Sequence, residues 1–329
     1  MSLESRLVRC WYAGRGWCLL LSPLSLLFGA LVWLRRGYYR WRPPVRLPVP
    51  VLVVGNITVG GTGKTPLVLW LVECLRAAGR RPGVVSRGYG AARSLPREVF
   101  ADSPADQVGD EPVLIARRGR CPVFVCRDRR SAGAALLQAH PEVDVLISDD
   151  GLQHYRLARD MEIVVVDGQR QLGNGHLLPA GPLREAASRL TRVDAVVVNG
   201  ALPAETAVVP SYAMKLLGSR FYNLRQPTRE APREYFVDRP VHAVAAIGNP
   251  SRFFEALGRM GIAVYPHAFP DHHPFSVGDL PKETVIMTEK DAVKCAAFGH
   301  DDIWVFAVDA RVSDGLEKQI LNLLDKFHG

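Results

Sequence analysis

Cysteine patterns that would support a disulfide framework or a zinc site are missing from this sequence. The six cysteines form no C-x-x-C pair and have no regular spacing. They are Cys10, Cys18, Cys74, Cys121, Cys126 and Cys295. The sequence therefore predicts free thiols in a reducing, cytosolic setting.

Internal repeats, low-complexity tracts and recognisable nucleic-acid-binding modules are also absent from the 329 residues. With 48% hydrophobic and 22% charged residues, the composition is that of an ordinary globular protein, which excludes global disorder. The length suffices for two domains, each with its own core. No stripe of aromatic and basic residues occurs beyond residue 42, so the net charge of +8 does not indicate a nucleic-acid partner.

The excess of positive charge is concentrated at the N-terminus. Residues 1–42 contain seven arginines and a single acid, Glu4, and they enclose an uncharged apolar stretch from Trp17 to Leu34. Four interpretations compete: a signal peptide, a transmembrane span, an interfacial membrane anchor and a buried core helix. No small-x-small cleavage site follows the stretch, which argues against a signal peptide, and 18 residues with Pro23 and Gly29 are short for a span. Arginines and aromatic residues flank both ends of the stretch, so we favour the interfacial anchor.

A glycine-rich segment, G-N-I-T-V-G-G-T-G-K-T-P at residues 55–66, lies between an apolar run at 51–54 and another at 67–72. The order of buried strand, glycine-rich loop and helix is that of a triphosphate-binding loop, because backbone N–H groups and a helix N-terminus together bind anionic oxygens. Lys64 is expected to reach the β- and γ-phosphates, and the Thr65 hydroxyl to help hold Mg²⁺. The candidate nucleotide-binding residues are Thr58, Gly60, Gly61, Thr62, Gly63, Lys64 and Thr65. In the pattern G-x-x-x-x-G-K-[ST], Thr58 stands where the first glycine is usual, but Gly60 and Gly61 allow a tight turn.

Short apolar strands recur through the chain and are separated by helical segments. The expected strands include residues 84–85, 123–125, 143–147, 163–166 and 193–198, with helices at 131–139 and 183–190. Continuous rather than alternating hydrophobicity predicts an α/β fold with a mostly parallel sheet covered by helices on both faces. A second α/β series begins at residue 241, after a polar, arginine-rich connection at 218–239, and a final amphipathic helix spans about 316–327.

Acidic residues follow one of these strands directly. Asp149 and Asp150 come at the end of the strand at 143–147, and in parallel sheets ligands bind beyond the carboxyl ends of strands. An apolar strand that ends in aspartate is typical of the second nucleotide-binding motif, whose carboxylate serves Mg²⁺. Solvated turn residues are the alternative interpretation.

Two further segments carry candidate catalytic groups. Asp110 and Glu111, in the loop segment G-D-E-P, are of the type needed to orient an acceptor hydroxyl and to hold magnesium. The segment Asp271-His272-His273 has three interpretations: a pair of metal ligands, a surface loop, or a base that reaches across an interdomain cleft. Adjacent histidines need not face the same way, which weakens the metal site, and the spacing alone favours the surface loop. Arg87 in S-R-G-Y-G and Arg184 in L-P-A-G-P-L-R-E suit phosphate binding, or are solvated turn arginines.

Taken together, these motifs resemble those of the tetraacyldisaccharide 4'-kinase family, the lipid A kinases of Gram-negative bacteria. The resemblance extends from the apolar N-terminus to about Lys294. The motifs that carry it are the phosphate loop, S-R-G-Y-G, G-D-E-P, D-D-G-L-Q-H, L-P-A-G-P-L-R-E, G-N-P-S-R-F-F, D-H-H-P-F and T-E-K-D-A-V-K. No motif departs clearly from the family pattern.

The resemblance implies a P-loop kinase that transfers the γ-phosphate of ATP, with Mg²⁺, to the 4'-hydroxyl of an acylated glucosamine disaccharide 1-phosphate. It implies that Asp110 and His272 form the dyad that activates the hydroxyl, with Asp150 as a further catalytic residue. Glu111, Asp149 and Thr65 would serve magnesium. The residues expected near the acceptor are Gln153, His154, Arg184 and Glu185.

The resemblance also implies a place in the cell and a division of the chain. We expect a monomer, peripheral or monotopic at the cytoplasmic face of the bacterial inner membrane, where its lipid substrate lies. The expected division is a membrane anchor at 1–42, a P-loop kinase core at 43–217, a smaller α/β domain at 218–315 and a C-terminal helix at 316–329. This helix is amphipathic and could pack on either domain, the core included.

The main alternative is an ATPase that uses nucleotide as a switch for partner binding. Such switches commonly carry a second lysine early in the phosphate loop, where this chain has Val59, which disfavours the alternative. Phosphate transfer to the acylated disaccharide would discriminate the two.

Overall fold

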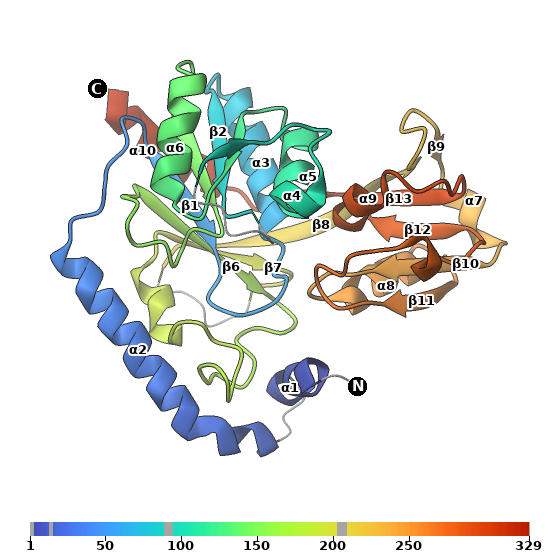
Figure 1. The fold of residues 1–329 in the computed structure, drawn as a ribbon, viewed down its shortest axis with the longest axis horizontal. Coiled ribbons are helices and arrows are strands. Elements are labelled where there is room, and N and C mark those ends of the chain that lie inside the picture. The colour runs from blue at the N-terminus through green and yellow to red at the C-terminus, as the bar shows by residue number, and fades with distance from the viewer. Residues whose placement is uncertain (1–2, 13–15, 89–94, 203–208, 329) are drawn as a thin grey trace.

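The fold alternates helices and strands around one large sheet, as predicted for the α/β class (Figure 1). The computed structural model describes residues 3–12, 16–88, 95–202 and 209–328. Within these residues thirteen strands form one sheet, in the order β11-β10-β12-β13-β8-β7-β6-β1-β5-β2-β4-β3, with β9 paired to β8.

The part built on β1 to β7 is called the core lobe. Its strands are β1 (Val51–Gly55), β2 (Pro82–Ser86), β3 (Arg97–Glu98), β4 (Val123–Val125), β5 (Val145–Asp149), β6 (Met161–Asp167) and β7 (Ala195–Asn199). Its helices are α3 (Lys64–Ala77), α4 (Ala105–Val108), α5 (Asp110–Gly119), α6 (Arg129–Ala139) and the 3₁₀ helix η2 (Ala187–Arg192). In the spatial order β4-β2-β5-β1-β6-β7, every neighbouring pair of strands is parallel. The strands β1 and β5, which carry the nucleotide motifs, therefore end at the same edge of the sheet.

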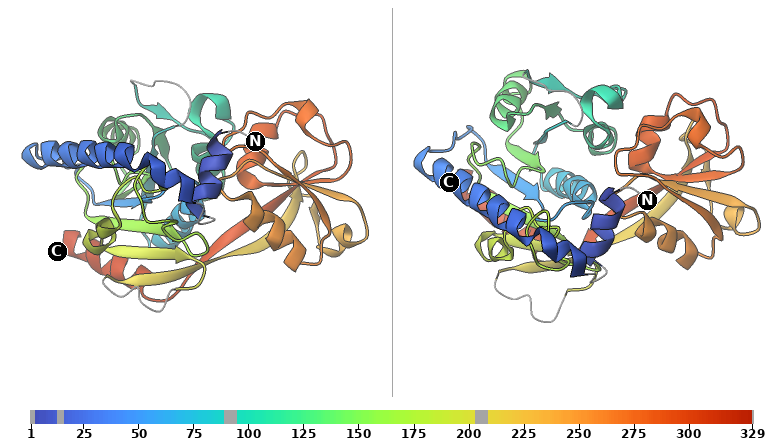
Figure 2. Two further views of the ribbon diagram at one scale, coloured as in Figure 1. Left: turned by 90° about the horizontal axis from the view of Figure 1, so that it is seen from below. Right: turned by 60° about the horizontal axis from the view of Figure 1, so that its bottom comes forward.

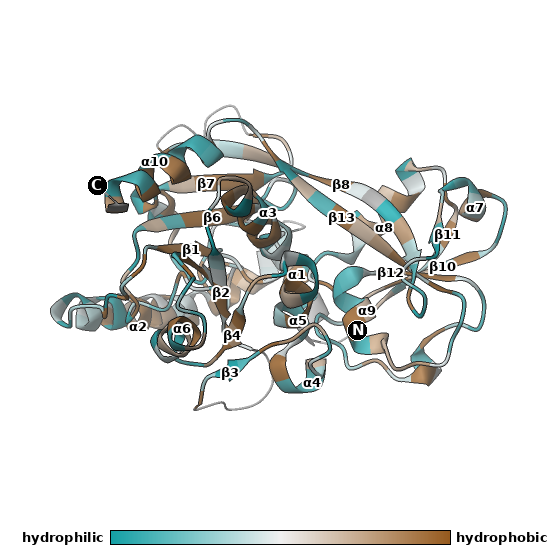
Figure 3. Cartoon of the chain, turned by 90° about the horizontal axis from the view of Figure 1, so that it is seen from above, coloured by the Kyte–Doolittle hydropathy of each residue, from teal (hydrophilic) through white to brown (hydrophobic). Residues whose placement is uncertain are grey.

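The core lobe is buried on both faces of its sheet, which explains the continuous apolar strands. All five residues of β1 and of β5 are buried. Figure 3 shows that the central strands of this lobe are largely hydrophobic. One face packs against α3, α5 and the C-terminal helix α10 (Leu316–His328), whose Leu316, Ile320 and Leu324 join the apolar cluster of this lobe. The other face is covered partly by α6 and by the loops after β5 and β6.

The part built on β9 to β12 is called the small lobe. It comprises β9 (Glu230–Ala231), β10 (Val241–Ala245), β11 (Val264–Ala268) and β12 (Val285–Thr288), with α7 (Glu234–Val237), α8 (Pro250–Arg259), α9 (Glu289–Cys295) and η3 (Val277–Asp279). Separate apolar clusters lie on the two faces of its sheet.

Two long antiparallel strands, β8 (Ser211–Asn223) and β13 (Ile303–Val312), run from one lobe into the other (Figure 1). The arginine-rich segment 218–239 therefore includes strand residues, although its polarity suggested only a connection. The boundary expected between residues 217 and 218 falls inside β8. The division of the chain into domains stays a prediction.

The N-terminal residues form α1 (Leu3–Tyr12), η1 (Gly16–Leu21) and α2 (Ser22–Trp41), and α2 lies along the outside of the core lobe (Figure 2). Residues 16–41 form a helical segment long and apolar enough to cross a membrane, and only 11% of its most apolar window is buried. That exposure is incompatible with the buried-core-helix alternative.

Contacts with the loop 177–180 fix the first half of α2. The Ser25 hydroxyl donates to the Leu177 carbonyl at 2.9 Å and accepts from the Ala180 N–H at 2.9 Å.

Two local expectations were wrong. The segment 183–190 does not form the expected helix: a 3₁₀ helix, η2, begins only at Ala187 and continues to Arg192. Cys10 and Cys18, expected as free thiols, are paired as a disulfide between α1 and η1.

Candidate active site

The phosphate loop connects β1 to α3, which begins at Lys64. Gly60 and Gly63 have φ values of 94° and 95°, a left-handed conformation that glycine adopts without steric cost. The loop is held from outside by the segment L-P-A-G-P-L-R-E: the Val59 N–H donates to the Pro182 carbonyl at 2.9 Å, and the Arg184 N–H to the Ile57 carbonyl at 2.7 Å. The N-terminus of α3 is thus presented to a ligand by a braced backbone.

The side chain of Lys64 lies over this loop and reaches toward the end of β5. Its Nζ lies 3.3 Å from Asp150 Oδ1 and donates to Asn56 Oδ1 at 3.3 Å. Thr65 follows in the first turn of α3. Burial alone would raise the pKa of Asp150, but Lys64 and Arg184 lower it to about 2, so this carboxylate is ionised.

Asp149 closes β5 beside Val54 of β1 and is only 1% exposed. The Ser86 hydroxyl donates to its Oδ2 at 3.1 Å, whereas Oδ1 is buried without a hydrogen-bond partner. Burial, with the neighbouring carboxylates of Glu111 and Asp150, raises the pKa of Asp149. A cation at this position would remove that penalty.

Asp110 and His272 meet across the cleft between the lobes. Asp110 begins α5, and His272 lies in the loop after β11 with a φ of 61°. His272 Nδ1 and Asp110 Oδ2 are 3.1 Å apart. This contact agrees with the alternative in which the segment 271–273 reaches across the cleft, and not with the solvated surface loop that the spacing favoured. His273 instead lies 3.4 Å from Asp279, which resolves which of the two histidines faces Asp110.

The surroundings of this pair favour the charged forms of both side chains, an aspartate anion and a histidine cation. Burial opposes ionisation of Asp110, but the hydrogen bond with His272 and the charges of Lys290 and Lys294 lower its pKa to about 2. Burial would lower the pKa of His272, but Asp110 and Asp271 outweigh it and raise that pKa. The positive φ of His272, a residue other than glycine, costs free energy, and backbone strain of this kind is common at functional sites.

Lys290 and Lys294 of α9 belong to the motif T-E-K-D-A-V-K, but the sequence predicted no role for either lysine. Lys290 Nζ donates to Glu111 Oε1 at 3.0 Å and to Asp271 Oδ1 at 3.1 Å. Lys294 Nζ lies 3.9 Å from Asp110 Oδ2. The signal was the i, i+4 spacing of the two lysines, which places both on one helix face. Glu111, expected to serve magnesium, is thus ion-paired with the small lobe.

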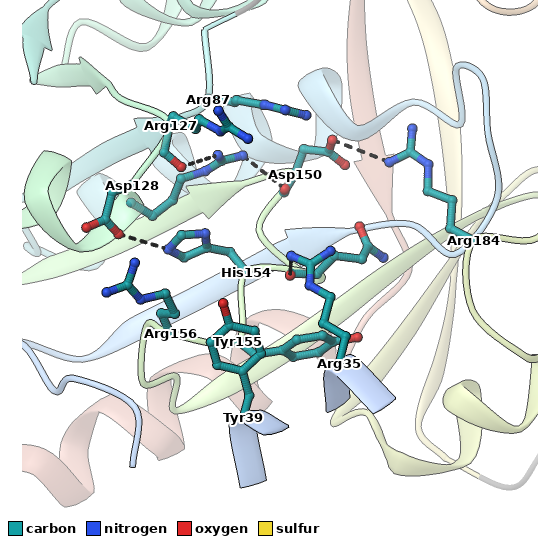
Figure 4. A pocket seen from close by; sticks show the side chains of 12 residues that line it. Arg35, Tyr39, Arg87, Arg127, Asp128, Asp150, His154, Tyr155, Arg156 and Arg184 are labelled. Atoms are coloured by element: carbon teal, nitrogen blue, oxygen red, sulfur yellow. Dashed lines mark hydrogen bonds and ion pairs between the residues drawn. The ribbon is translucent and has the colours of Figure 1, made fainter. Parts of the chain in front are cut away.

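Gln153, His154 and Arg184 line a basic pocket next to the phosphate loop (Figure 4). Its volume is about 680 Å³, and it contains six arginines against two aspartates. The arginines are Arg35, Arg87, Arg127, Arg129, Arg156 and Arg184. Burial and the charge of Arg129 lower the pKa of His154 to about 4, despite Asp128 at 3.3 Å. A neutral imidazole in a cationic pocket is suited to donating or accepting hydrogen bonds.

Glu185, also expected near the acceptor, is 1% exposed and is held on several sides. Gln153 Nε2 and the Tyr155 hydroxyl each donate to its carboxylate at 2.9 Å, and Arg36 of α2 lies 3.6 Å away. Its contacts orient Gln153 and attach the second half of α2 to the pocket.

A second cavity of about 440 Å³ adjoins the basic pocket, since both are lined by Arg35, Arg87, Asp150, Gln153, Tyr155 and Arg184. This cavity contains Gly60, Gly61 and Lys64 on one side and Asp110 and His272 on another. Phe28 and Val32 of α2 complete its wall. A phosphate donor and an acceptor can therefore meet beside the apolar helix.

Comparison with known proteins gives this geometry a family. Residues 17–325 match the family model described as tetraacyldisaccharide-1-P 4'-kinase, or LpxK. The chain belongs to this family. The tetraacyldisaccharide 4'-kinase of Azoarcus sp. strain BH72 is 54% identical over 319 residues, covering 94% of this chain and 92% of that protein. The enzyme of the same name from Methylobacillus flagellatus is 48% identical over 331 residues, covering 99% and 98%.

A solved structure of the family has the same fold. LpxK from Aquifex aeolicus, crystallised in complex with ATP, is 28% identical, has a TM-score of 0.78 and matches 94% of this chain and 99% of that chain. The α/β fold and the family resemblance predicted from the sequence are thereby confirmed.

Proposed function

We propose that the protein transfers the γ-phosphate of ATP to the 4'-hydroxyl of a tetraacyldisaccharide 1-phosphate in lipid A biosynthesis. The observation that carries this proposal is a pair of adjoining cavities in a family member: one is lined by the phosphate loop and the Asp110–His272 pair, and it shares six lining residues with the basic pocket. The phosphate loop binds the triphosphate through its amides, and Lys64 moves from Asp150 to the β- and γ-phosphates.

Magnesium fits the acidic end of β5. The buried Oδ1 of Asp149, which lacks a hydrogen-bond partner, is a hard oxygen ligand of the kind that Mg²⁺ prefers. Thr65 and Asp149 would hold the ion, with Glu111 joining them if Lys290 releases it. Bound there, the ion would neutralise charge that develops on the transferring phosphoryl group.

The acceptor hydroxyl is oriented by Asp110. A carboxylate whose pKa is lowered to about 2 is a weak proton acceptor early in the reaction, but it is a strong hydrogen-bond acceptor. In phosphoryl transfer, where the transition state is loose, alignment of the nucleophile contributes more than early deprotonation. His272 fixes the direction of the carboxylate. Asp150, next to Lys64, contributes to the placement of the transferred phosphate.

The basic pocket binds the phosphorylated disaccharide. Arginine forms bidentate hydrogen bonds with phosphate, and Arg184 and Arg87 line both cavities. Gln153 and His154 supply neutral hydrogen bonds to sugar hydroxyls, and Glu185 acts through Gln153.

The acyl chains lie along α2, which also holds the enzyme at the membrane. Leu20 of η1 is 82% exposed, and Leu26 and Trp33 of α2 are 76% and 73% exposed, so this helical segment presents an apolar surface to a bilayer. We place the helix in the interface of the cytoplasmic leaflet of the inner membrane, with its arginines at the headgroups.

Transfer of labelled γ-phosphate to the acylated disaccharide 1-phosphate in mixed micelles tests the proposal. The expected product carries label at the 4' position and forms only with a divalent cation. ATP hydrolysis without lipid phosphorylation would favour the nucleotide-switch alternative instead.

A further inference from the structure

The loop after β10 in the small lobe lies directly against the phosphate loop. A Cβ built on Gly248 would come within 1.9 Å of the Gly61 nitrogen and 2.7 Å of the Gly61 Cα. The reverse is less severe, since a Cβ on Gly61 would lie 3.3 Å from Gly248. Gly248 does not have a positive φ, so glycine is required there by the neighbouring lobe and not by its own backbone.

Ionic and amide groups surround this backbone contact. Arg170, in the loop after β6, donates to the Gly248 carbonyl at 2.6 Å and to Asn249 Oδ1 at 3.1 Å. In return, Arg252 of α8 donates to Asp167 Oδ1 at 2.9 Å. Asp167 is 3% exposed and Asn249 8%, so these bonds are made away from bulk water. We call Asp167, Arg170, Gly248, Asn249 and Arg252 the interlobe clasp.

The clasp is also connected to the inside of the phosphate loop through Asn199, at the end of β7. The Asn199 side-chain amide donates to the Thr62 carbonyl at 3.0 Å. Its own backbone carbonyl accepts a hydrogen bond from Arg252 at 3.2 Å. Arg252 thus contacts the residue that braces the backbone just before Gly63.

We propose that the interlobe clasp is a positioning device for phosphoryl transfer: it docks the small lobe on the phosphate loop and thereby brings His272 to Asp110. The clasp and the Asp110–His272 pair are separate contacts between the same two lobes. Loss of one therefore changes the geometry of the other. This inference rests on the proposed kinase function for its kinetic consequence, but the contact itself can be tested without any substrate.

Gly248→Ala is the sharpest test, because it inserts one methyl group between the lobes. Gly258→Ala is its matched control: this glycine is on α8 of the same lobe, a Cβ there meets nothing within 4 Å, and its φ is not positive. We expect Gly248→Ala to lower kcat on the order of 10²-fold, the effect of a displacement of about 1 Å at a reacting centre. KM for ATP should change far less, and Gly258→Ala should match the wild type.

Hydrogen exchange by mass spectrometry, on the full chain without nucleotide, reads the contact directly. Peptides containing residues 60–63 and 248–252 should exchange faster in Gly248→Ala than in Gly258→Ala, with the rest of both proteins unchanged. Arg252→Gln, which introduces no steric conflict, should also speed exchange in the same peptides and lower kcat. Arg252→Lys, which keeps the positive charge, should restore part of that loss in kcat.

Unchanged exchange in Gly248→Ala would overturn the clasp as a contact. Faster exchange in Gly248→Ala with an unchanged kcat would overturn the positioning role of the clasp. Faster exchange with an increased kcat would also overturn it and would indicate an inhibitory contact. Failure of the wild type to phosphorylate the lipid would reject the proposed function alone, since the exchange result stands apart from it.

Discussion

The phosphate loop and the acceptor side of the cavity are built in opposite ways. Residues 58–65, which comprise the loop and the first residues of α3, form one contiguous stretch after a buried strand, and their proposed function depends mainly on backbone amides and one lysine. The acceptor side draws side chains from α2, α6, the loops after β5 and β6, and the small lobe. A contiguous site is encoded by local sequence, whereas a dispersed one exists only when the separate segments are assembled.

The largest expected effect comes from the contiguous side. Lys64→Met should lower kcat/KM on the order of 10³-fold, because it removes a cation from the developing phosphoryl charge. Lys282→Met, an exposed lysine in the small lobe, is the control. Steady-state kinetics with the lipid acceptor would measure both, and a loss of less than about tenfold would contradict the role of Lys64.

Asp110→Ala probes the point where the two sides meet. We expect kcat to fall on the order of 10²-fold, with ATP affinity nearly unchanged, because the carboxylate orients the acceptor and not the nucleotide. Asp106→Ala, an exposed acid on α4, should have no effect. His272→Ala combined with Asp110→Ala should cost little more than Asp110→Ala alone, since the two act as a unit. Additive losses would separate their roles.

Changes on α2 should affect the acceptor side while sparing the nucleotide. Leu26→Glu combined with Trp33→Glu places two carboxylates on the exposed apolar surface, so binding to anionic vesicles should weaken by about tenfold or more. The apparent KM for lipid should rise and ATP binding should be retained. Phe327→Glu, on the exposed end of α10, is the control. Unaltered vesicle binding in flotation assays would exclude α2 as the anchor.

The smallest effect concerns pH. Because the pKa of His272 is raised above 6.5, its ion pair contributes fully below that pH and is lost as pH rises through the raised value. Asp110 has a lowered pKa, so its contribution is present above 3.8 and is lost as pH falls toward about 2. The Tm advantage of wild type over His272→Gln should therefore shrink by about 2 °C between neutral and alkaline pH. An advantage that grows with pH would contradict the pairing.

How much the sequence predicts follows this same contrast. The strand, loop and helix around Lys64 were predicted because one stretch of chain carries the whole pattern. Asp110 and His272 are 162 residues apart, so their pairing followed only from the family resemblance. The place of Gly248 against Gly61 could not be predicted, because its reason is a neighbour from another lobe. The polarity of the segment 218–239 similarly obscured the end of β8, which pairs with β13 from Met214 to Asn223.

The two strands that join the lobes determine how the lobes can move. The β8–β13 pairing is continuous from Met214 and Val312 to Asn223 and Trp304, apart from a register shift at Ala307 and Val308. A flexible linker would let the small lobe diffuse freely, but a hydrogen-bonded ribbon resists bending and twisting. Any displacement of the small lobe has to bend or twist these two paired strands, and the ladder between them is interrupted at the irregular step beside Gly218.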